Sequence, residues 1–553
     1  MVLQAFMNPI TNIQSAFDSY VLSHFPSITD LQQARLTVQT DPAKSFGDLT
    51  TTLPLVLSKQ VKRAPREIAA DIIAQFKHPL IEKIEVAGPG FLNISLTNKA
   101  FIELGTQIIE QGASFFKQEL PLNKKINIEF VSANPTGPLH FGHGRGAIIG
   151  DVLGAVFSFL GADVTREFYI NDAGLQIERL GNSFKVRCLQ ALGEDIAIPE
   201  DGYHGIYLAD LAQNCVIIYG PSLKEKPDSF FAQYAQEHML ENIKDTLRDY
   251  KVNFDVWFSE RVLHTSDAIE KAISLLKSYN VLYEAENALW FKSTQFGDDK
   301  DRVIRKSDGQ WTYVAADIAY MLNKVERGFK QLIMILGHDH HSYLTRLNCV
   351  HQALHITQCP LDIILYQLVT IVEDGQLVQM SKRAGSGVTL KQVIDAVGVD
   401  VARFLYLYKK ADAQLEFDVQ LALKTTDENP VYYVQYAYVR CSSIFNKAEQ
   451  ELGVLELKIK DLEYLSNAEY LLLKKIYSLR SQLSAVANLL QPHLVAYYAV
   501  ELADVFHKYY SQHRVIDSKN LLQTKARLLI IQAVRDTLGF TFDLMNISRP
   551  ERM

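Results

Sequence analysis

Residues 126–145 read INIEFVSANPTGPLHFGHGR, and this stretch decides the fold. Its first five residues predict a buried strand, the next are a turn rich in Asn, Pro and Gly, and a helix is expected to begin near His143. A second unit of this kind occurs later, where KQLIMIL (330–336) precedes GHDHHSYLTRLNCVHQAL (337–354). Strands that alternate with helices in this way are typical of a parallel, Rossmann-like α/β sheet.

The rest of the chain predicts two further domains around this sheet, because 553 residues exceed one domain of roughly 150 residues. Residues 1–115 mix helical stretches with two alternating runs on either side of Gly88-Pro89-Gly90, which predicts an α+β domain with a hairpin. The segment GASFFKQELPLNKK (112–125) is interpreted as a linker. Residues 116–412 then form the α/β domain with an insertion, and residues 413–553 predict an all-α helical bundle without strands.

The composition, with 48% hydrophobic and 22% charged residues, is that of a globular protein. No run approaches the roughly 18 apolar residues of a membrane span. No Lys or Arg precedes Arg35, which argues against a secretory signal and a mitochondrial presequence. Five cysteines without a CxxC pair fit a reducing compartment. We therefore expect a cytoplasmic protein with no membrane partner. The net charge of −7 does not exclude nucleic acid, because binding depends on local patches.

The glycine turn in residues 137–146 is the first candidate site. Gly142 and Gly144 allow a ligand to approach the backbone, and the start of the helix favours anions. His140 and His143 can donate hydrogen bonds to phosphate oxygens. The turn lacks both GxxxxGK[ST] and GxGxxG, which excludes a P-loop and a dinucleotide fingerprint. An ordinary glycine turn with incidental histidines is the alternative.

The second candidate site is the stretch Met380-Ser381-Lys382-Arg383, which follows a predicted hairpin at VEDGQL (372–377). A basic stretch flanked by glycines can offer cations to phosphates. A solvated basic loop is the alternative reading of the same residues.

Together, these segments resemble the signature pair of class I aminoacyl-tRNA synthetases. His140-Phe141-Gly142-His143 is similar to their His-Ile-Gly-His motif, and Met380-Ser381-Lys382 is similar to the core of Lys-Met-Ser-Lys-Ser. The chain departs from these motifs at Phe141, Gln379 and Arg383. Other segments resemble the bacterial arginyl-tRNA synthetases in particular: FGDLTT (46–51), DGYHGIYLADLA (201–212), ENPVYYVQYAYVR (428–440) and PERM (550–553).

The resemblance implies an enzyme that activates arginine with ATP to arginyl-adenylate and pyrophosphate, and then transfers arginine to the terminal adenosine of arginine tRNA. Members of the family typically need bound tRNA for the first step, and Mg²⁺ would accompany ATP. By resemblance, His140 and His143 hold the ATP phosphates and Lys382 neutralises the departing pyrophosphate. The other nucleotide-binding residues that it implies are Pro138, Gly142, Gly144, Gly337, Met380 and Ser381.

The guanidinium of the substrate requires carboxylates in a planar, bidentate arrangement. Asp317 is the first choice, since it lies four residues after Tyr313 and would share its helix face. Both match positions where the family binds the arginine side chain. The resemblance adds further arginine-binding residues: Glu129, Ser132, Asn134, Glu260 and His341. The sequence leaves open which of them contact the guanidinium and which the α-amino group.

The cluster Gly337–His341 has two readings, a zinc site or the wall of a nucleotide and amino-acid pocket. The cluster contains no cysteine, and metal sites rarely use three histidines in such close succession. Its place after a parallel strand is where ligand sites of α/β proteins form. We favour the pocket wall and expect no metal held by the protein.

The C-terminal region is dense in tyrosine and resembles the anticodon-binding domain of the family. Exposed aromatic side chains can stack on single-stranded bases. The tRNA-binding residues that the resemblance implies are Tyr432, Tyr436, Arg440, Arg549 and Met553. We expect a monomer with no DNA partner.

Two other functions stay open at this point. One is a nucleotidyltransferase with an HxGH motif, which would not need the helical tail. The other is a catalytically silent RNA-binding paralogue, which would be expected to lose His140, His143 or Lys382, and all three are present.

Overall fold

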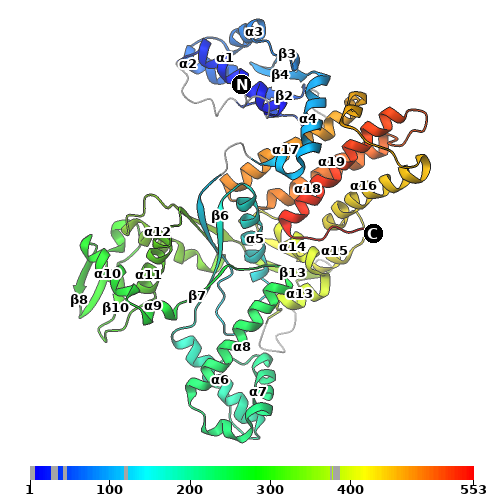
Figure 1. The fold of residues 1–553 in the computed structure, drawn as a ribbon. Coiled ribbons are helices and arrows are strands. Elements are labelled where there is room, and N and C mark those ends of the chain that lie inside the picture. Colours follow the sequence, from blue (N-terminus) through cyan, green and yellow to red (C-terminus); the bar gives the residue numbers. More distant parts are fainter. Residues whose placement is uncertain (1–6, 27–34, 42–45, 118–121, 374–375, 378–386) are drawn as a thin grey trace.

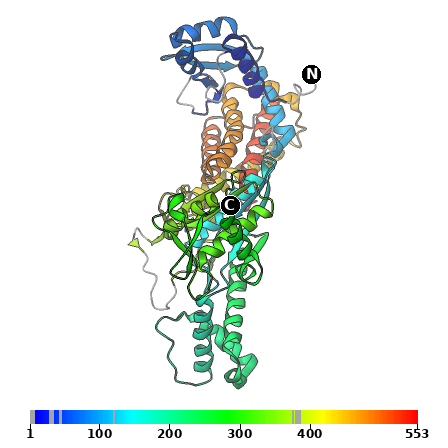
Figure 2. The ribbon, with the colours of Figure 1, turned by 90° about the vertical axis from the view of Figure 1, so that its left-hand side faces the viewer.

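The computed structural model describes residues 7–26, 35–41, 46–117, 122–373, 376–377 and 387–553. The molecule is elongated, with the N-terminal part at one end and the helices α6–α8 at the other (Figure 1 and Figure 2). The parallel sheet lies between these ends, beside the C-terminal helices. This confirms the predicted combination of a Rossmann-like sheet, an α+β domain and a helical bundle. Within the described residues, every helix is too short or too polar to span a bilayer.

An antiparallel sheet with the order β1-β2-β4-β3 organises the N-terminal part. The predicted hairpin is confirmed, because β3 and β4 pair on either side of Gly88 and Gly90, whose φ angles of 52° and 142° favour glycine. Every second residue of β4 is buried, so one face of the sheet packs against helices. The elements are α1 (Pro9–His24), β1 (Thr37–Val38), β2 (Leu49–Thr51), α2 (Leu53–Val61), α3 (Pro65–Gln75), β3 (Ile81–Ala87) and β4 (Phe91–Leu96).

The central sheet has five parallel strands in the order β12-β11-β5-β6-β7. Its strands are β5 (Lys125–Glu129), β6 (Asp163–Ile170), β7 (Val256–Ser259), β11 (Gln331–Gly337) and β12 (Leu361–Tyr366). Helix α5 (His143–Phe159) returns the chain from β5 to β6 and is buried along most of its length. Since β6 and β11 pair with opposite sides of β5, the strand order reverses there, and a crevice is expected at the C-terminal ends.

Two insertions interrupt the sheet. The first lies between β6 and β7 and contains α6 (Leu175–Ala191), α7 (Ile206–Tyr219) and α8 (Asp228–Asp249). The second lies between β7 and β11 and contains α9 (Arg261–Thr265), α10 (Ala268–Ser278), β8 (Leu282–Ala285), β9 (Ala288–Phe291), β10 (Arg302–Arg305) and α11 (Tyr313–Glu326). Helix α12 (His341–Ala353) follows β11. The second insertion shares a hydrophobic core with β11 and α12, so α11 packs beside the sheet.

The expectation that no strand follows Asp412 is wrong. Strand β15 (Leu415–Asp418) pairs in parallel with β13 (Val369–Glu373), which also pairs with β14 (Gln376–Leu377). Only Leu415 and Phe417 of this short strand are buried, so four residues gave too little alternation to be recognised. The remaining elements of this region are α13 (Leu390–Val397), α14 (Val399–Leu407) and α15 (Val419–Leu423).

The C-terminal bundle is helical as predicted. It consists of α16 (Pro430–Leu452), α17 (Asn467–Leu489), α18 (His493–Gln512) and α19 (Leu521–Met545). The predicted linker is partly wrong, because α4 (Asn98–Gln111) runs into a short 3-10 helix at Gly112–Phe116. Phe115 and Phe116 are buried there against Tyr477 and Phe540 of the bundle. Aromatic anchors therefore fix the N-terminal part to the C-terminal helices.

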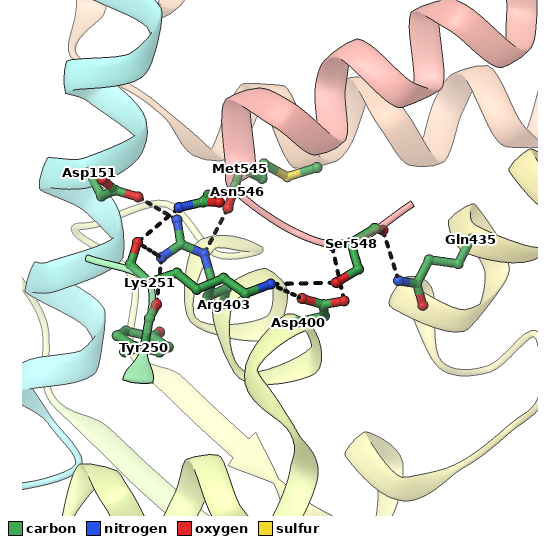
Figure 3. Close-up of polar contacts among 9 residues, drawn as sticks. All are labelled: Asp151, Tyr250, Lys251, Asp400, Arg403, Gln435, Met545, Asn546 and Ser548. Atoms are coloured by element: carbon green, nitrogen blue, oxygen red, sulfur yellow. Dashed lines mark hydrogen bonds and ion pairs between the residues drawn. The ribbon is translucent and has the colours of Figure 1, made fainter. Parts of the chain in front are cut away.

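A fully buried arginine joins the C-terminal bundle to the part of the chain that contains the parallel sheet (Figure 3). Arg403 of α14 donates from Nε to the carbonyl of Met545 at 2.8 Å, and from Nη1 to the carbonyls of Tyr250 and Lys251 at 2.8 and 3.2 Å. Its Nη2 donates to the carboxylate of Asp151 on α5. One guanidinium thus connects the end of α19, the turn after α8 and the helix that begins at the glycine turn.

Candidate active site

A cavity of about 860 Å³ lies at the C-terminal ends of the parallel strands, beside the reversal of strand order at β5. Its wall comes from the turn after β5, from the ends of β6, β7, β11 and β12, and from α11 and α12. Ligands of open α/β sheets bind at this position. The predicted site residues in its wall are Glu129, Ser132, Asn134, Pro138, His140, His143, Glu260, Tyr313, Asp317 and Gly337.

The turn after β5 holds two non-glycine residues in the left-handed region. The φ angle is 67° at Val131 and 40° at Ser132, which is a costly conformation for a β-branched residue. The Ser132 hydroxyl donates to Glu129 Oε1 at 3.2 Å and accepts from the backbone N–H of Tyr169 at 3.0 Å. The strained turn thus fixes Ser132 between β5 and β6 and leads the chain to Asn134 on the cavity wall.

The two histidines of the glycine turn have one ring nitrogen each engaged. Nδ1 of His140 accepts from the backbone N–H of Gly142 at 3.2 Å, and Nδ1 of His143 accepts from that of His140 at 3.1 Å. A neutral imidazole that accepts at Nδ1 carries its proton on Nε2. Partial desolvation lowers the pKa of His140, and burial together with the nearby His140 lowers the pKa of His143 to about 4. Both rings are therefore neutral at pH 7 and offer an Nε2–H donor.

Asp317 of α11 has one oxygen engaged and one free. The Tyr343 hydroxyl donates to Oδ1 at 2.5 Å, whereas Oδ2 is buried and has no hydrogen-bond partner within the described part of the chain. Desolvation raises the pKa of Asp317 to about 7, although Tyr343 and Arg346 act in the opposite direction. A buried acceptor without a partner is costly, so Oδ2 is suited to accept from a ligand.

Two further carboxylates face the same cavity. Glu260 is 3% exposed and lies 3.3 Å from His264 Nε2, and desolvation raises its pKa. Glu129 is also buried, and its Oε2 lies 2.5 Å from Nζ of the buried Lys324. Because Lys324 already neutralises Glu129, Asp317 and Glu260 are the acids of this group that suit a cationic ligand.

Among the described residues that were predicted to bind ATP or arginine, three do not line the cavity: Gly142, Gly144 and His341. A Cβ on Gly144 would lie 2.7 Å from Leu390 and 3.1 Å from Tyr406, so packing requires glycine at this position. His341 is exposed at the start of α12.

The residues after the second motif lie against the first motif. His140 and Thr389 form an isolated antiparallel bridge, and the N–H of Phe141 donates to the carbonyl of Val388 at 3.0 Å. Residues of the second motif lie outside the described residues: Gln379, Met380, Ser381, Lys382 and Arg383. Val388 and Thr389, which follow the second motif in the sequence, therefore pair with the first motif.

Several cavity residues were missed by the sequence reasoning: Tyr169, Lys324, Tyr343 and Arg346. Lys324 follows Asp317 by seven residues, so the buried face of α11 could have revealed it. Tyr343 and Arg346 also share a helix face, but their spacing is equally typical of an ordinary packed pair.

The Gly337–His341 cluster contributes Gly337, Asp339 and His340 to the cavity wall. Over the described ranges, no group of three or more His, Cys, Asp or Glu side chains could hold a metal ion.

Three residues predicted to bind tRNA gather on α16. The rings of Tyr432 and Tyr436 are stacked with centroids 6.1 Å apart, and the Arg440 guanidinium lies 4.5 Å from the centroid of Tyr436 and 5.1 Å from that of Tyr510. All four side chains are half-buried, so each retains an exposed part.

The two predicted tail residues follow α19. Gln435 of α16 donates to the carbonyl of Ser548 at 3.4 Å, so the tail begins beside the α16 cluster. Arg549 forms an ion pair with Asp543, and Met553 is 49% exposed.

Three family models match the chain: the arginyl tRNA synthetase N-terminal domain over residues 11–96, the catalytic domain of class I (R) tRNA synthetases over 105–415, and the DALR anticodon binding domain over 434–553. Arginine--tRNA ligase 1 of Halalkalibacterium halodurans is 40% identical over 95% of this chain and 96% of its own length. Arginine--tRNA ligase of Bacillus subtilis is 39% identical over 94% and 95%. Thermus thermophilus arginyl-tRNA synthetase, at 18% identity, shares the fold over 98% of this chain and 100% of its own, with a TM-score of 0.72. The chain therefore belongs to the arginyl-tRNA synthetase family, and as a class I arginine--tRNA ligase it uses ATP to attach arginine to its tRNA.

Proposed function

We propose that arginine is activated in the cavity at the ends of the parallel strands, with its guanidinium held by Asp317 and Glu260. The main support is Asp317 Oδ2, a buried acceptor without a partner in the described chain. A guanidinium beside it would donate to this oxygen and neutralise its charge. Tyr313, which is 58% exposed on the same helix, would cover the bound side chain.

The turn after β5 would hold the backbone of the amino acid. Ser132 and Asn134 lie in the cavity wall, and the strained conformation at Ser132 fixes its hydroxyl. Glu129 would orient Ser132 rather than contact the guanidinium, because Lys324 already neutralises it.

The glycine turn and the second motif would hold ATP. His140 and His143 would donate from Nε2 to the phosphates, since both Nδ1 atoms already accept. Lys382 would neutralise the departing pyrophosphate. Further nucleotide contacts would come from Pro138, Gly337, Met380 and Ser381. Gly144 would act indirectly, by allowing α5 to pack against Leu390.

Mg²⁺ would enter the site together with ATP. Phosphate oxygens and water supply most Mg²⁺ ligands in nucleotide sites, and the described residues offer no three-residue cluster for it. When bound, the ion would neutralise part of the negative charge on the ATP phosphates.

The chemistry would be an in-line attack of the arginine carboxylate on the α-phosphorus of ATP, which forms arginyl-adenylate and expels pyrophosphate. The 2′-hydroxyl of the terminal adenosine would then attack the arginyl carbonyl carbon, lose its proton and release AMP. The side chains contribute by positioning and by stabilising charge.

We propose that tRNA contacts both ends of the chain, the N-terminal domain (1–115) and the helical domain (413–553). The exposed faces of Tyr432, Tyr436 and Arg440 would meet the anticodon together with Arg549 and Met553. The protein would bind tRNA as a monomer, because its three domains together supply the contacts. It would act in the cytoplasm, without a membrane or DNA partner.

Pyrophosphate exchange into ATP, run with each of the twenty amino acids and with or without bulk tRNA, tests this proposal. We expect exchange with arginine, appearing only when tRNA is added. Exchange with arginine in the absence of tRNA would contradict the tRNA requirement but not the activation of arginine in this cavity. No exchange with any amino acid, from folded protein, would contradict activation in this cavity.

The ionisation of Asp317 predicts a pH dependence of arginine binding. Because desolvation raises the pKa of Asp317 to about 7, its carboxylate is lost as the pH falls through that value, while the substrate guanidinium stays charged. We expect KM for arginine to be about tenfold higher at pH 6 than at pH 8. A KM that stays constant over this range would contradict the role of Asp317.

The role of Lys382 predicts a split between chemistry and binding. Lys382→Ala should lower kcat for exchange by about 10²-fold or more and change the KM for ATP less than threefold, because its charge acts on the departing pyrophosphate. Measurement of both constants checks this. Equal losses in kcat and in ATP affinity would indicate ground-state binding instead.

A further inference from the structure

An arginine of the protein itself lies in the wall of the cavity that takes arginine. Arg346 is half-buried on α12, three residues after Tyr343. Its guanidinium carbon lies 5.3 Å from the centroid of the Tyr343 ring. Its Nε is buried, and Arg346 makes no hydrogen bond or ion pair with any described residue. Polar groups in a partly buried site normally have hydrogen-bond partners, so an unpaired guanidinium in a substrate cavity indicates a function for its charge.

Tyr343 connects this guanidinium to Asp317. Its ring carries Arg346 on one side, and its hydroxyl donates to Asp317 Oδ1 at 2.5 Å. This bond holds the carboxylate in place, while Oδ2 stays free for a ligand. Arg346 is therefore a cation on the far side of the tyrosine that bonds the proposed substrate-binding acid, and it leaves the Oδ2 of that acid free.

The charged groups that face Asp317 come from all the surrounding elements. Glu129 of β5 is compensated by Lys324 of α11. Glu260 follows β7 and adds a second negative charge when it is ionised, and Tyr169 of β6 lies close to Asp317, Glu260 and Glu129. Arg346 of α12 acts on Asp317 with the opposite sign.

The net charge of these groups is negative when both acids are ionised, which favours a cationic ligand. When both are ionised, Asp317 and Glu260 carry two negative charges against the single positive charge of Arg346. A bound guanidinium would bring the sum to zero, whereas a neutral side chain would leave one uncompensated charge in a desolvated site. Without Arg346, the pKa of Asp317 would rise further above its ordinary value, so a larger fraction would be protonated at neutral pH and the preference of the cavity for a cation would weaken.

We propose that Arg346 is a specificity-determining residue whose positive charge favours the ionised form of Asp317, so that the cavity selects a guanidinium over the neutral ureido group of citrulline. This inference rests on the proposed role of Asp317 in holding the guanidinium.

The test is the pH profile of arginine recognition in full-length Arg346→Gln, with Arg346→Lys as the matched control that keeps the charge. KM for arginine is measured by pyrophosphate exchange with tRNA present, between pH 5.5 and 8.5, together with KM for ATP. We expect the midpoint of the arginine profile to rise by about one pH unit in Arg346→Gln and to stay near the parent value in Arg346→Lys. We also expect the preference for arginine over citrulline to fall about tenfold at pH 7 in Arg346→Gln alone.

Other outcomes would overturn the proposal in distinct ways. A rise in KM for arginine that is equal at every pH would mean that Arg346 binds the substrate carboxylate. A rise in KM for ATP alone would mean that it binds a phosphate, and no change in either constant would mean that it is a bystander. If Arg346→Gln does not fold, Tyr343→Phe is used as a second variant. It removes the hydrogen bond to Asp317 Oδ1 and should also raise the midpoint of the pH profile for arginine. If Asp317→Asn leaves KM for arginine unchanged, the proposed role of Asp317 fails, independently of Arg346.

Discussion

Asp317→Asn is expected to lower kcat/KM for arginine by about 10³-fold, or ~4 kcal/mol, because loss of one partner from a buried charge pair leaves the other uncompensated.

The same substitution, Asp317→Asn, is expected to increase the free energy of unfolding at pH 8. A buried acid with a raised pKa is less stabilising when ionised, so stability is lost as the pH rises through the interval between its unfolded pKa, about 4, and its folded pKa, about 7. The variant should therefore unfold at a higher temperature than the parent at pH 8, and the gain should be smaller at pH 5. Exchange kinetics and thermal unfolding at both pH values measure the two effects.

Glu326→Gln is the matched control for this variant. Glu326 lies on the same helix, α11, but its carboxylate is exposed and pairs with Lys271. We expect less than a twofold change in kcat/KM and a stability change within about 0.5 kcal/mol. If Asp317→Asn and Glu326→Gln behave alike, the buried carboxylate does not hold the guanidinium.

Arg403→Met is expected to lower the free energy of unfolding by about 3–5 kcal/mol, the typical loss when one partner of a buried ion pair is removed. The substitution leaves Asp151 without its buried partner and removes the donors to the carbonyls of Met545 and Tyr250, in the junction of Figure 3. Arg166, whose Nε lies 3.7 Å from Asp151 Oδ1, would compensate only part of the loss. Urea unfolding of the full chain, monitored by circular dichroism, measures the effect.

Lys251→Met is the control in the same junction. Lys251 pairs with Asp400 at 3.1 Å, but its side chain is 37% exposed, so the expected loss is below about 1 kcal/mol. In the double variant with Asp151→Asn, Arg403→Met should cost less than it does alone, because the unpaired acid is then absent. Additive losses would show that Arg403 acts through its backbone contacts instead of Asp151.

Much of the fold could be predicted because local patterns were strong. The run LIMIL in β11 is continuous and apolar, as is typical of a parallel strand buried on both faces. The run INIEF alternates Ile and Phe with Asn127 and Glu129, which is the strand period, and it forms most of β5. The hairpin at Gly88 and Gly90 was also predictable, since its turn needs positive φ angles. The strand Leu415–Asp418 was missed because its pairing with β13 is non-local and only two of its residues are buried.

The features of the candidate site also fall into those that local sequence patterns predict and those that depend on contacts between distant segments. The sequence by itself determined the family and the glycine turn with His140 and His143, and it led to the prediction that Asp317 binds the substrate, because residue type and spacing are local properties of the chain. Only the tertiary structure decided which charges are compensated. Lys324 is distant from Glu129 in the sequence, yet they form a buried ion pair, and Tyr343 reaches Asp317 only because α11 and α12 pack side by side. The protonation and charge balance of the cavity depend on such contacts between distant segments, through desolvation and short distances that no local pattern encodes.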